Sequence, residues 1–229
     1  MLDDLAWLSL EVLYAERASE FYAETFDLEP AYRDGSVVFP VGDHELRLVE
    51  PGPVPRGGLH VHFAMATPPA QYDGWVSRLE RDHDIEEHSF GSSQSVYLFD
   101  PDGHCAEIGS VGDPAAEESL TGIFEVVFEV EDLERAETFY SELGFSVVDR
   151  GDSRRRVRMT GPVDLELWEP QRGLADARGG VHVDVGFTAT DPVAVRDRVA
   201  DLASETTRDD DWVRIRDPDG HFLTITPTG

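Results

Sequence analysis

The sequence predicts an α+β protein built from four βαβββ modules. Three observations predict this class: the second half of the chain repeats the first, each half alternates strand-like and helix-like stretches twice, and a DPDGH turn precedes the last strand of each half. Self-similarity at a fixed period indicates a structural unit that is copied along the chain. With 229 residues, the chain is long enough for two small domains.

Corresponding stretches of the two halves lie about half a chain length apart. LRLVEP (46–51) corresponds to LELWEP (165–170), and the turn at 100–104 corresponds to the turn at 217–221. In a DPDG turn, Asp, Pro and Gly occupy the positions that a type I turn favours. Each turn is therefore expected to join the last two strands of a module.

A polar, acidic segment of small residues, GDPAAEESLTG (112–122), separates the halves. Such composition is typical of a linker. The sequence therefore predicts two tandem domains, 1–112 and 119–229, each containing two modules.

Periodicity assigns the elements of the first half. Residues 6–12 alternate as in a strand, whereas 15–26 have helical apolar spacing. Short strands follow up to Leu48, and the second module begins at Leu59, continues with a helix over 71–81 and ends near Ile108.

The charge of the chain restricts its partners and its setting. The formal net charge is −28, all 19 basic residues are Arg, and a single Cys excludes a disulfide within the chain. Without a basic patch, nucleic acid is not an expected partner. No apolar run has the length of a membrane span and the N-terminus is acidic, so we expect neither a membrane anchor nor a signal peptide. We expect a cytoplasmic protein of a halophilic organism.

The sequence is similar to the vicinal oxygen chelate superfamily through its LERAETFY-type helices and DPDGH turns. This group includes glyoxalase I, bleomycin and fosfomycin resistance proteins, and extradiol dioxygenases. The resemblance covers nearly the whole chain. It implies two glyoxalase-like domains with curled mixed sheets and a divalent metal held by up to four side chains.

The resemblance places the metal-binding positions. In modules two and three they are occupied by His62, Glu107, Glu125 and Glu166, and in modules one and four by Trp7, Arg47, Asp184 and Thr224. If modules pair between the halves, the chain has one complete site, for Mn, Fe, Co, Ni or Zn, and one site that cannot bind metal. If each half instead forms its own site, neither half contributes a set of side chains suited to binding a metal. Alternatively, Glu125 could lie on a solvent-exposed face of its strand and bind nothing.

The resemblance also implies a reaction class. A metal beside these carboxylates would stabilise an enediolate while Glu107, or else Glu125, moves a proton, so we expect an isomerase or lyase acting on a small vicinal-oxygen substrate. Two alternatives stay open. An extradiol dioxygenase would need two His and one carboxylate, and a metal-free drug-binding protein would need only a cavity.

Three further residues are candidates for substrate contact. Arg156 and Arg158 share one strand face and could bind an anion, or could pair with the acidic surface. Cys105 shares a strand face with Glu107 and could line the site, or could simply pack as a small buried side chain. We expect a monomer or a homodimer that binds a small molecule.

The charge generates a first prediction. Repulsion among acidic groups should destabilise the fold in dilute buffer, and added salt should relieve it. In thermal melts with increasing KCl, the melting temperature should keep rising well above roughly 0.1 M, where simple screening is largely complete. A melting temperature that does not respond to KCl would contradict salt adaptation.

Overall fold

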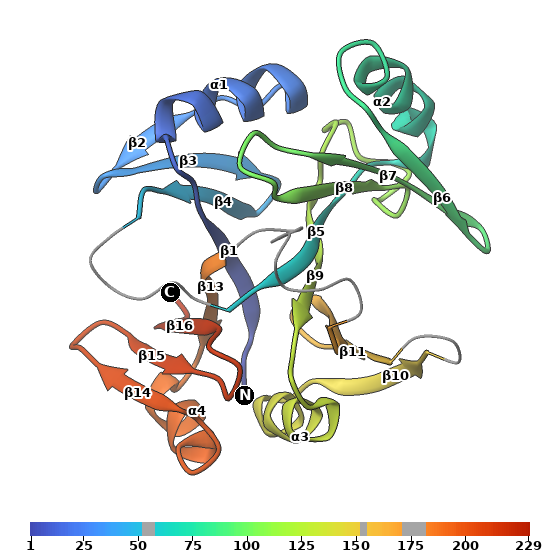
Figure 1. Ribbon diagram of the computed structural model, residues 1–229. Coiled ribbons are helices and arrows are strands. Elements are labelled where there is room, and N and C mark those ends of the chain that lie inside the picture. The colour runs from blue at the N-terminus through green and yellow to red at the C-terminus, as the bar shows by residue number, and fades with distance from the viewer. Residues whose placement is uncertain (52–57, 152–154, 171–181) are drawn as a thin grey trace.

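The computed structural model describes residues 1–51, 58–151, 155–170 and 182–229 (Figure 1). Modules one and two lie in the upper part of Figure 1 and modules three and four in the lower part, with β5 and β9 near the centre. The α+β fold of four βαβββ modules is confirmed. Among the described residues, no helix is both long and apolar enough to span a membrane.

The first eight-stranded sheet combines modules one and four. Its order is β14-β15-β16-β13-β1-β4-β3-β2, and β1 and β13 pair antiparallel at its centre. Its strands are β1 (Asp4–Glu11), β2 (Ala31–Arg33), β3 (Ser36–Val41), β4 (His44–Val49), β13 (His182–Ala189), β14 (Glu205–Arg208), β15 (Val213–Arg216) and β16 (Phe222–Pro227).

The second eight-stranded sheet combines modules two and three. Its order is β10-β11-β12-β9-β5-β8-β7-β6, and β5 and β9 pair antiparallel at its centre. Its strands are β5 (His60–Ala66), β6 (Glu86–Phe90), β7 (Ser93–Phe99), β8 (Cys105–Gly109), β9 (Gly122–Glu129), β10 (Ser146–Arg150), β11 (Arg156–Thr160) and β12 (Asp164–Trp168). The modules therefore pair between the halves, one of the two arrangements that the sequence left open. The division into domains 1–112 and 119–229 stays a prediction.

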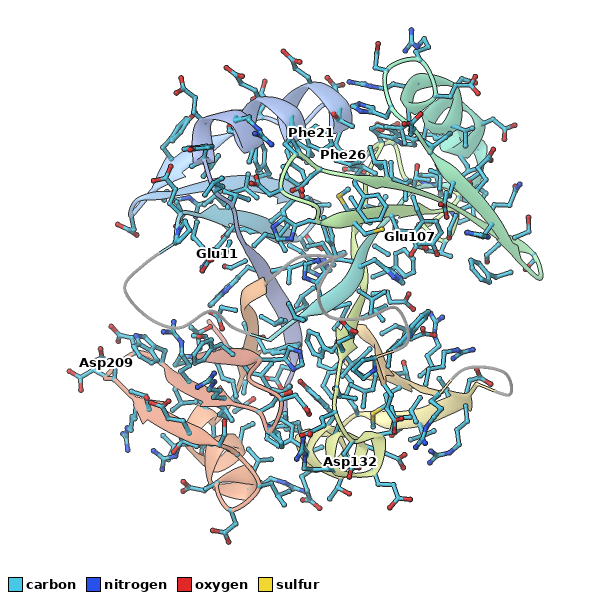
Figure 2. The ribbon with its side chains drawn as sticks, in the orientation of Figure 1. Glu11, Phe21, Phe26, Glu107, Asp132 and Asp209 are labelled. Atoms are coloured by element: carbon cyan, nitrogen blue, oxygen red, sulfur yellow. The ribbon has the colours of Figure 1, made fainter. Side chains whose placement is uncertain are left out.

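In each module the helix connects the first strand to the second, and the helices lie on the outside of the molecule (Figure 1). They are α1 (Ala15–Phe26), η1 (Pro69–Gln71), α2 (Tyr72–Leu79), α3 (Leu133–Leu143) and α4 (Pro192–Val199). The aromatic rings of Phe26 and Trp75 lie 6.5 Å apart, so α1 and α2 pack against each other. In Figure 2 Phe21 and Phe26 lie on α1, and Asp132 lies at the start of α3, where its carboxylate caps the Arg135 amide.

Alternation along the strands gives each sheet an apolar and a polar face. On β1, Leu8 and Leu10 are fully buried in the core. Trp7 and Ser9 point to the opposite face, here called the polar face of the first sheet. The polar face of the second sheet contains the side chains of His62, Glu107 and their neighbours.

The DPDGH turns connect different modules. Asp100 accepts hydrogen bonds from the backbone amide of His104 and from the Tyr22 hydroxyl, at 2.8 and 3.0 Å. The His104 imidazole in turn donates to the Glu11 carbonyl at 2.9 Å. In the second copy, His221 lies 2.7 Å from Asp217 and donates to the Leu59 carbonyl. These histidines are structural, which explains why both halves contain them.

Gly186 shapes the polar face of the first sheet. It pairs with Trp7 across β1 and β13, and a Cβ at this position would lie 2.0 Å from the Trp7 ring. The indole therefore lies flat on the backbone, where a side chain on β13 would exclude it. Arg47 covers the ring from the other side, with its Cζ 3.8 Å from the ring centroid.

We predict that Gly186→Ala destabilises the protein by about 1–3 kcal/mol, because the new methyl group must displace the buried indole. Urea unfolding would measure the change in the free energy of unfolding. The control is Gly74→Ala in α2, where a Cβ has no heavy atom within 4 Å. That control should be neutral or stabilising by roughly 0.5–1 kcal/mol. Equal effects of the two substitutions would contradict the close Trp7 packing.

Candidate metal centre

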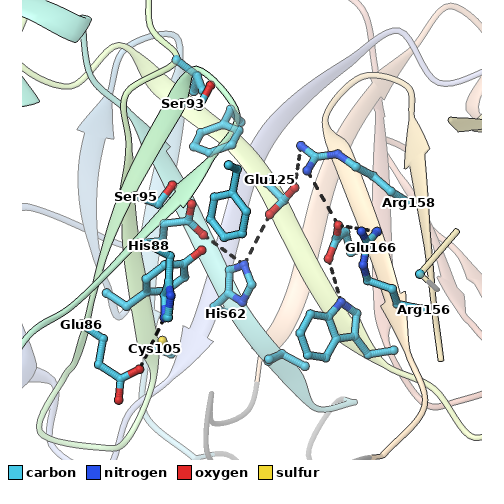
Figure 3. A pocket seen from close by; sticks show the side chains of 18 of the residues that line it. His62, Glu86, His88, Ser93, Ser95, Cys105, Glu125, Arg156, Arg158 and Glu166 are labelled. Atoms are coloured by element: carbon cyan, nitrogen blue, oxygen red, sulfur yellow. Dashed lines mark hydrogen bonds and ion pairs between the residues drawn. The ribbon is translucent and has the colours of Figure 1, made fainter. Parts of the chain in front are cut away.

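Strand register brings two carboxylates to either side of a small residue. Ala64 on β5 pairs with Glu107 on β8 and with Glu125 on β9. His62 precedes Ala64 by two residues, so its imidazole lies on the same face of β5. A methyl side chain thus leaves the space into which three larger polar side chains converge (Figure 3).

The three side chains meet around the imidazole of His62. Its Nε2 lies 3.0 Å from Glu107 Oε2 and 3.3 Å from Glu125 Oε1. One ligand atom from each residue lies within 4.8 Å of the other two, and all three residues are buried. Glu125 comes from the second half of the chain, so the cluster forms only because modules two and three share a sheet.

The carboxylates determine the protonation of this cluster. Burial by itself lowers the pKa of His62, but the hydrogen bonds and charges of Glu107 and Glu125 outweigh it and raise the pKa to about 9. Burial raises the pKa of Glu107, yet its interactions with His62, Ser95 and Tyr97 outweigh burial and lower the pKa overall. Without metal, the cluster is therefore an imidazolium between two carboxylates.

The donor atoms of the cluster are of the kind that bind a divalent metal ion. Glu107 Oε2 and Glu125 Oε2 are buried, and each faces a positively charged group: His62 Nε2 lies 3.0 Å from the first and Arg158 lies 2.8 Å from the second. One imidazole and two carboxylates suit Mn, Fe, Co, Ni or Zn. Binding would replace the proton on His62.

Glu166, the expected fourth ligand, lies beside this cluster. Its Oε1 accepts a hydrogen bond from Arg156 at 3.1 Å, and its Oε2 accepts one from the Trp168 indole at 2.7 Å. Burial and the nearby Glu125 raise the pKa of Glu166. The structure thus gathers three of the four expected ligands around one point and engages the fourth elsewhere.

The two candidate substrate arginines are paired with carboxylates. Arg158 lies 2.8 Å from Glu125 and 2.9 Å from Asp164, and Arg156 lies 2.7 Å from Asp149. Both arginines line the same cavity as the cluster (Figure 3). Pairing and substrate contact are therefore compatible, since each guanidinium has several N–H donors.

A cavity of about 1330 Å³ opens over the polar face of the second sheet, and Cys105 lines it. More acidic than basic side chains line the cavity, so its field favours cations. The acidic ones are Asp84, Glu86, Glu107, Glu125, Glu129, Asp149, Glu166 and Glu169, and the arginines are Arg150, Arg156 and Arg158.

Tyr97 belongs to the site but is missing from the sequence-based candidates. It pairs with Glu107 across β7 and β8, and its ring meets the His62 ring edge-on at 5.4 Å. Burial and the charge of Glu107 raise the pKa of its hydroxyl, so the phenol stays protonated and can donate. The sequence could have indicated Tyr97, because strand alternation places Ser95, Tyr97 and Phe99 on one face.

On the polar face of the first sheet, the corresponding side chains bind one another. Asp184 accepts a hydrogen bond from the Trp7 indole at 3.2 Å, and Arg214 donates to Thr224 at 2.9 Å. Arg47 is bound by Glu45 through two hydrogen bonds of 2.9 and 2.7 Å. Among the described residues, these groups form no cluster that could hold a metal.

Comparison with solved structures identifies the fold. A candidate dioxygenase from Bacillus subtilis shares 15% identity at a TM-score of 0.74, over 99% of this chain and 85% of that chain. The chain has the vicinal oxygen chelate fold. Glyoxalase I from Zea mays is also similar, with 18% identity and a TM-score of 0.71 over 98% of this chain and 92% of that chain. No protein-family model and no curated protein matches the sequence.

A buried aspartate generates a pH prediction. Burial raises the pKa of Asp184 from 3.8 to about 6, and its partners Arg214, Thr224 and Trp7 reduce the shift only in part. The fold therefore favours the protonated form, and ionisation between about pH 4 and 6 costs stability. Asp184→Asn should raise the free energy of unfolding by up to about 3 kcal/mol above pH 7.

The gain from Asp184→Asn should shrink toward zero below pH 4, where the aspartate is protonated in both folded and unfolded chains. Urea unfolding of both proteins at several pH values provides the measurement. If the two stability curves stay parallel from pH 4 to pH 8, Asp184 does not carry a buried charge.

Proposed function

We propose that the protein is a divalent-metal-dependent, glyoxalase-like isomerase or lyase acting on a small substrate with two neighbouring oxygens. One observation carries this proposal: His62, Glu107 and Glu125 converge from both halves of the chain, are buried, and bring one ligand atom each to within 4.8 Å of the other two. When bound there, a metal ion supplies Lewis acidity that stabilises negative charge on the substrate oxygens.

Proton transfer would be carried out by a carboxylate of the chain. Glu107 has a lowered pKa and is ionised at neutral pH, so it can accept a proton from a substrate carbon. It lines the cavity, where a substrate can reach it. Glu125 is the second candidate for this base, but the guanidinium of Arg158 lies 2.8 Å from its Oε2 and competes for that oxygen.

Substrate orientation follows from the other lining residues. Tyr97 can donate a hydrogen bond, and Arg156 and Arg158 present N–H donors from the opposite wall. Cys105 adds a small side chain to the lining of the same cavity. Because carboxylates dominate the lining, we expect a neutral or weakly charged substrate such as the hemithioacetal of an α-oxoaldehyde, rather than a strongly anionic one.

The extradiol dioxygenase alternative receives no support from the donor set. That chemistry uses two His and one carboxylate, whereas the described cluster contains one His and two carboxylates. Metal-free binding of a small molecule in the cavity is the remaining alternative, and metal analysis of the purified protein separates the two.

Glu107→Gln tests the proposal because it keeps the size of the side chain and removes its charge. Wild type saturated with Mn²⁺ at about 100 times its Kd should gain roughly 2.7 kcal/mol of stability over chelator-treated protein. Glu107→Gln should lose most of this gain and all turnover of an α-oxoaldehyde hemithioacetal. Melting curves with Mn²⁺ and with chelator measure the first effect.

The matched control is Thr224→Ala, at the corresponding position of the first sheet. Thr224 lies on β16 with its hydroxyl bonded to Arg214, so its loss should change neither Mn²⁺ stabilisation nor turnover. Equal loss in both variants, or no Mn²⁺ stabilisation of the wild type, would contradict the proposed centre.

A further inference from the structure

We propose that the cavity over the second sheet contains an apolar subsite formed by Phe90, Val111 and Phe124, and that the substrate carries an aromatic group next to its two oxygens. This inference rests on the proposed function, which it deepens by naming the class of substrate. All three side chains line the same cavity as Glu107.

Strand register places the subsite one step along the sheet from the metal cluster. Glu107 on β8 pairs with Tyr97 on β7, and the next β8 residue on the same face, Gly109, pairs with Ser95. Two residues along a strand correspond to roughly 6.5 Å. A substrate whose reacting carbon lies at Glu107 can therefore place an attached ring beside Gly109.

A bulge and a glycine place the ring of Phe124 at this position. Ile123 pairs with Met65 of β5 and Glu125 pairs with Ala64, so Phe124 is the extra residue of a bulge in β9. A Cβ on Gly109 would lie 2.7 Å from the Phe124 ring, so the ring lies against the bare backbone of β8. The half-buried ring thus adds an apolar surface next to Glu125.

Phe90 and Val111 extend this apolar surface. Phe90 pairs with Ser93 at the end of the β6–β7 hairpin. Val111 follows β8, and the preceding amide, that of Ser110, donates to the Gln94 carbonyl at 2.8 Å, which keeps this segment beside β7. Phe90 is 59% exposed and Val111 is 44% exposed. The cavity-facing residues of β7 at this end, Ser93 and Ser95, have small side chains (Figure 3).

The position of these apolar groups favours a ligand over chance exposure. Single exposed apolar side chains are common on protein surfaces. Here three of them follow one another from the metal cluster to one end of a cavity whose other lining is rich in charged groups. An apolar group that covers them removes apolar surface from water, which is favourable. Because two of the three are phenyl rings, edge-to-face or offset contacts favour an aromatic group in particular.

Two hydroxamates test the subsite. Acetohydroxamate and benzohydroxamate present the same pair of neighbouring oxygens and differ only in methyl against phenyl. In calorimetric titrations of the Mn²⁺-loaded full chain, benzohydroxamate should bind at least about tenfold more tightly, since its phenyl group buries additional apolar surface. Phe90→Ala and Phe124→Ala should each lower this preference at least about threefold, with the affinity for acetohydroxamate nearly unchanged.

The matched control is Phe99→Ala. Phe99 lines the same cavity and is 47% exposed, but it lies six residues beyond Ser93 on β7, roughly 20 Å away. This substitution should leave the phenyl preference unchanged. Melting curves establish that each variant folds, and the exposure of Phe90 makes its substitution the one that the fold tolerates best.

The outcomes distinguish the two proposals. Equal binding of both hydroxamates, or a phenyl preference that Phe90→Ala and Phe124→Ala leave intact, overturns the apolar subsite and leaves the proposed function standing. Benzohydroxamate binding that chelator does not weaken contradicts the proposed function, whereas a preference lost in Phe90→Ala but kept in Phe99→Ala still supports the subsite. If neither hydroxamate binds the Mn²⁺-loaded protein, both proposals fail.

Discussion

The antiparallel pairing of β5 with β9 is the interaction on which the candidate site depends. It joins a strand of the first half to a strand of the second and sets Ala64 opposite Glu125. The parallel pairing of β5 with β8 sets Glu107 on the other side of Ala64. Two ladders on one central strand thus fix the spacing of both carboxylates relative to His62. A shift of one residue in either ladder would turn a carboxylate away from this face.

The two sheets show that scaffold and chemistry are separable. β1 and β13 pair as β5 and β9 do, yet Trp7 lies flat on Gly186 and fills the space that stays open above Ala64. Asp184 is buried there with an indole and an arginine as its neighbours. The same backbone therefore carries a cluster that fits a metal in one sheet and, in the other, a packed face that contains Arg47 and Arg214. Function thus resides in the site rather than in the fold.

The sequence predicted the parts of the structure that repeat. The four modules, the turns at Asp100 and Asp217 and the strand positions of His62, Glu107 and Glu125 all follow from patterns visible in the chain. The surroundings of Glu166 did not, because its bonds to Arg156 and Trp168 depend on side-chain conformations. Tyr97 was missed for a related reason: its position beside Glu107 comes from cross-strand pairing, which single-strand periodicity does not reveal.

The central claim is that one sheet binds a metal and the other does not. Anomalous X-ray diffraction from crystals soaked in Mn²⁺ tests it most directly. We predict one peak per chain, roughly 2.0–2.3 Å from His62 Nε2 and within ligand distance of Glu107 and Glu125. No peak at this position, or the strongest peak on the polar face of the first sheet near Asp184, would contradict the claim.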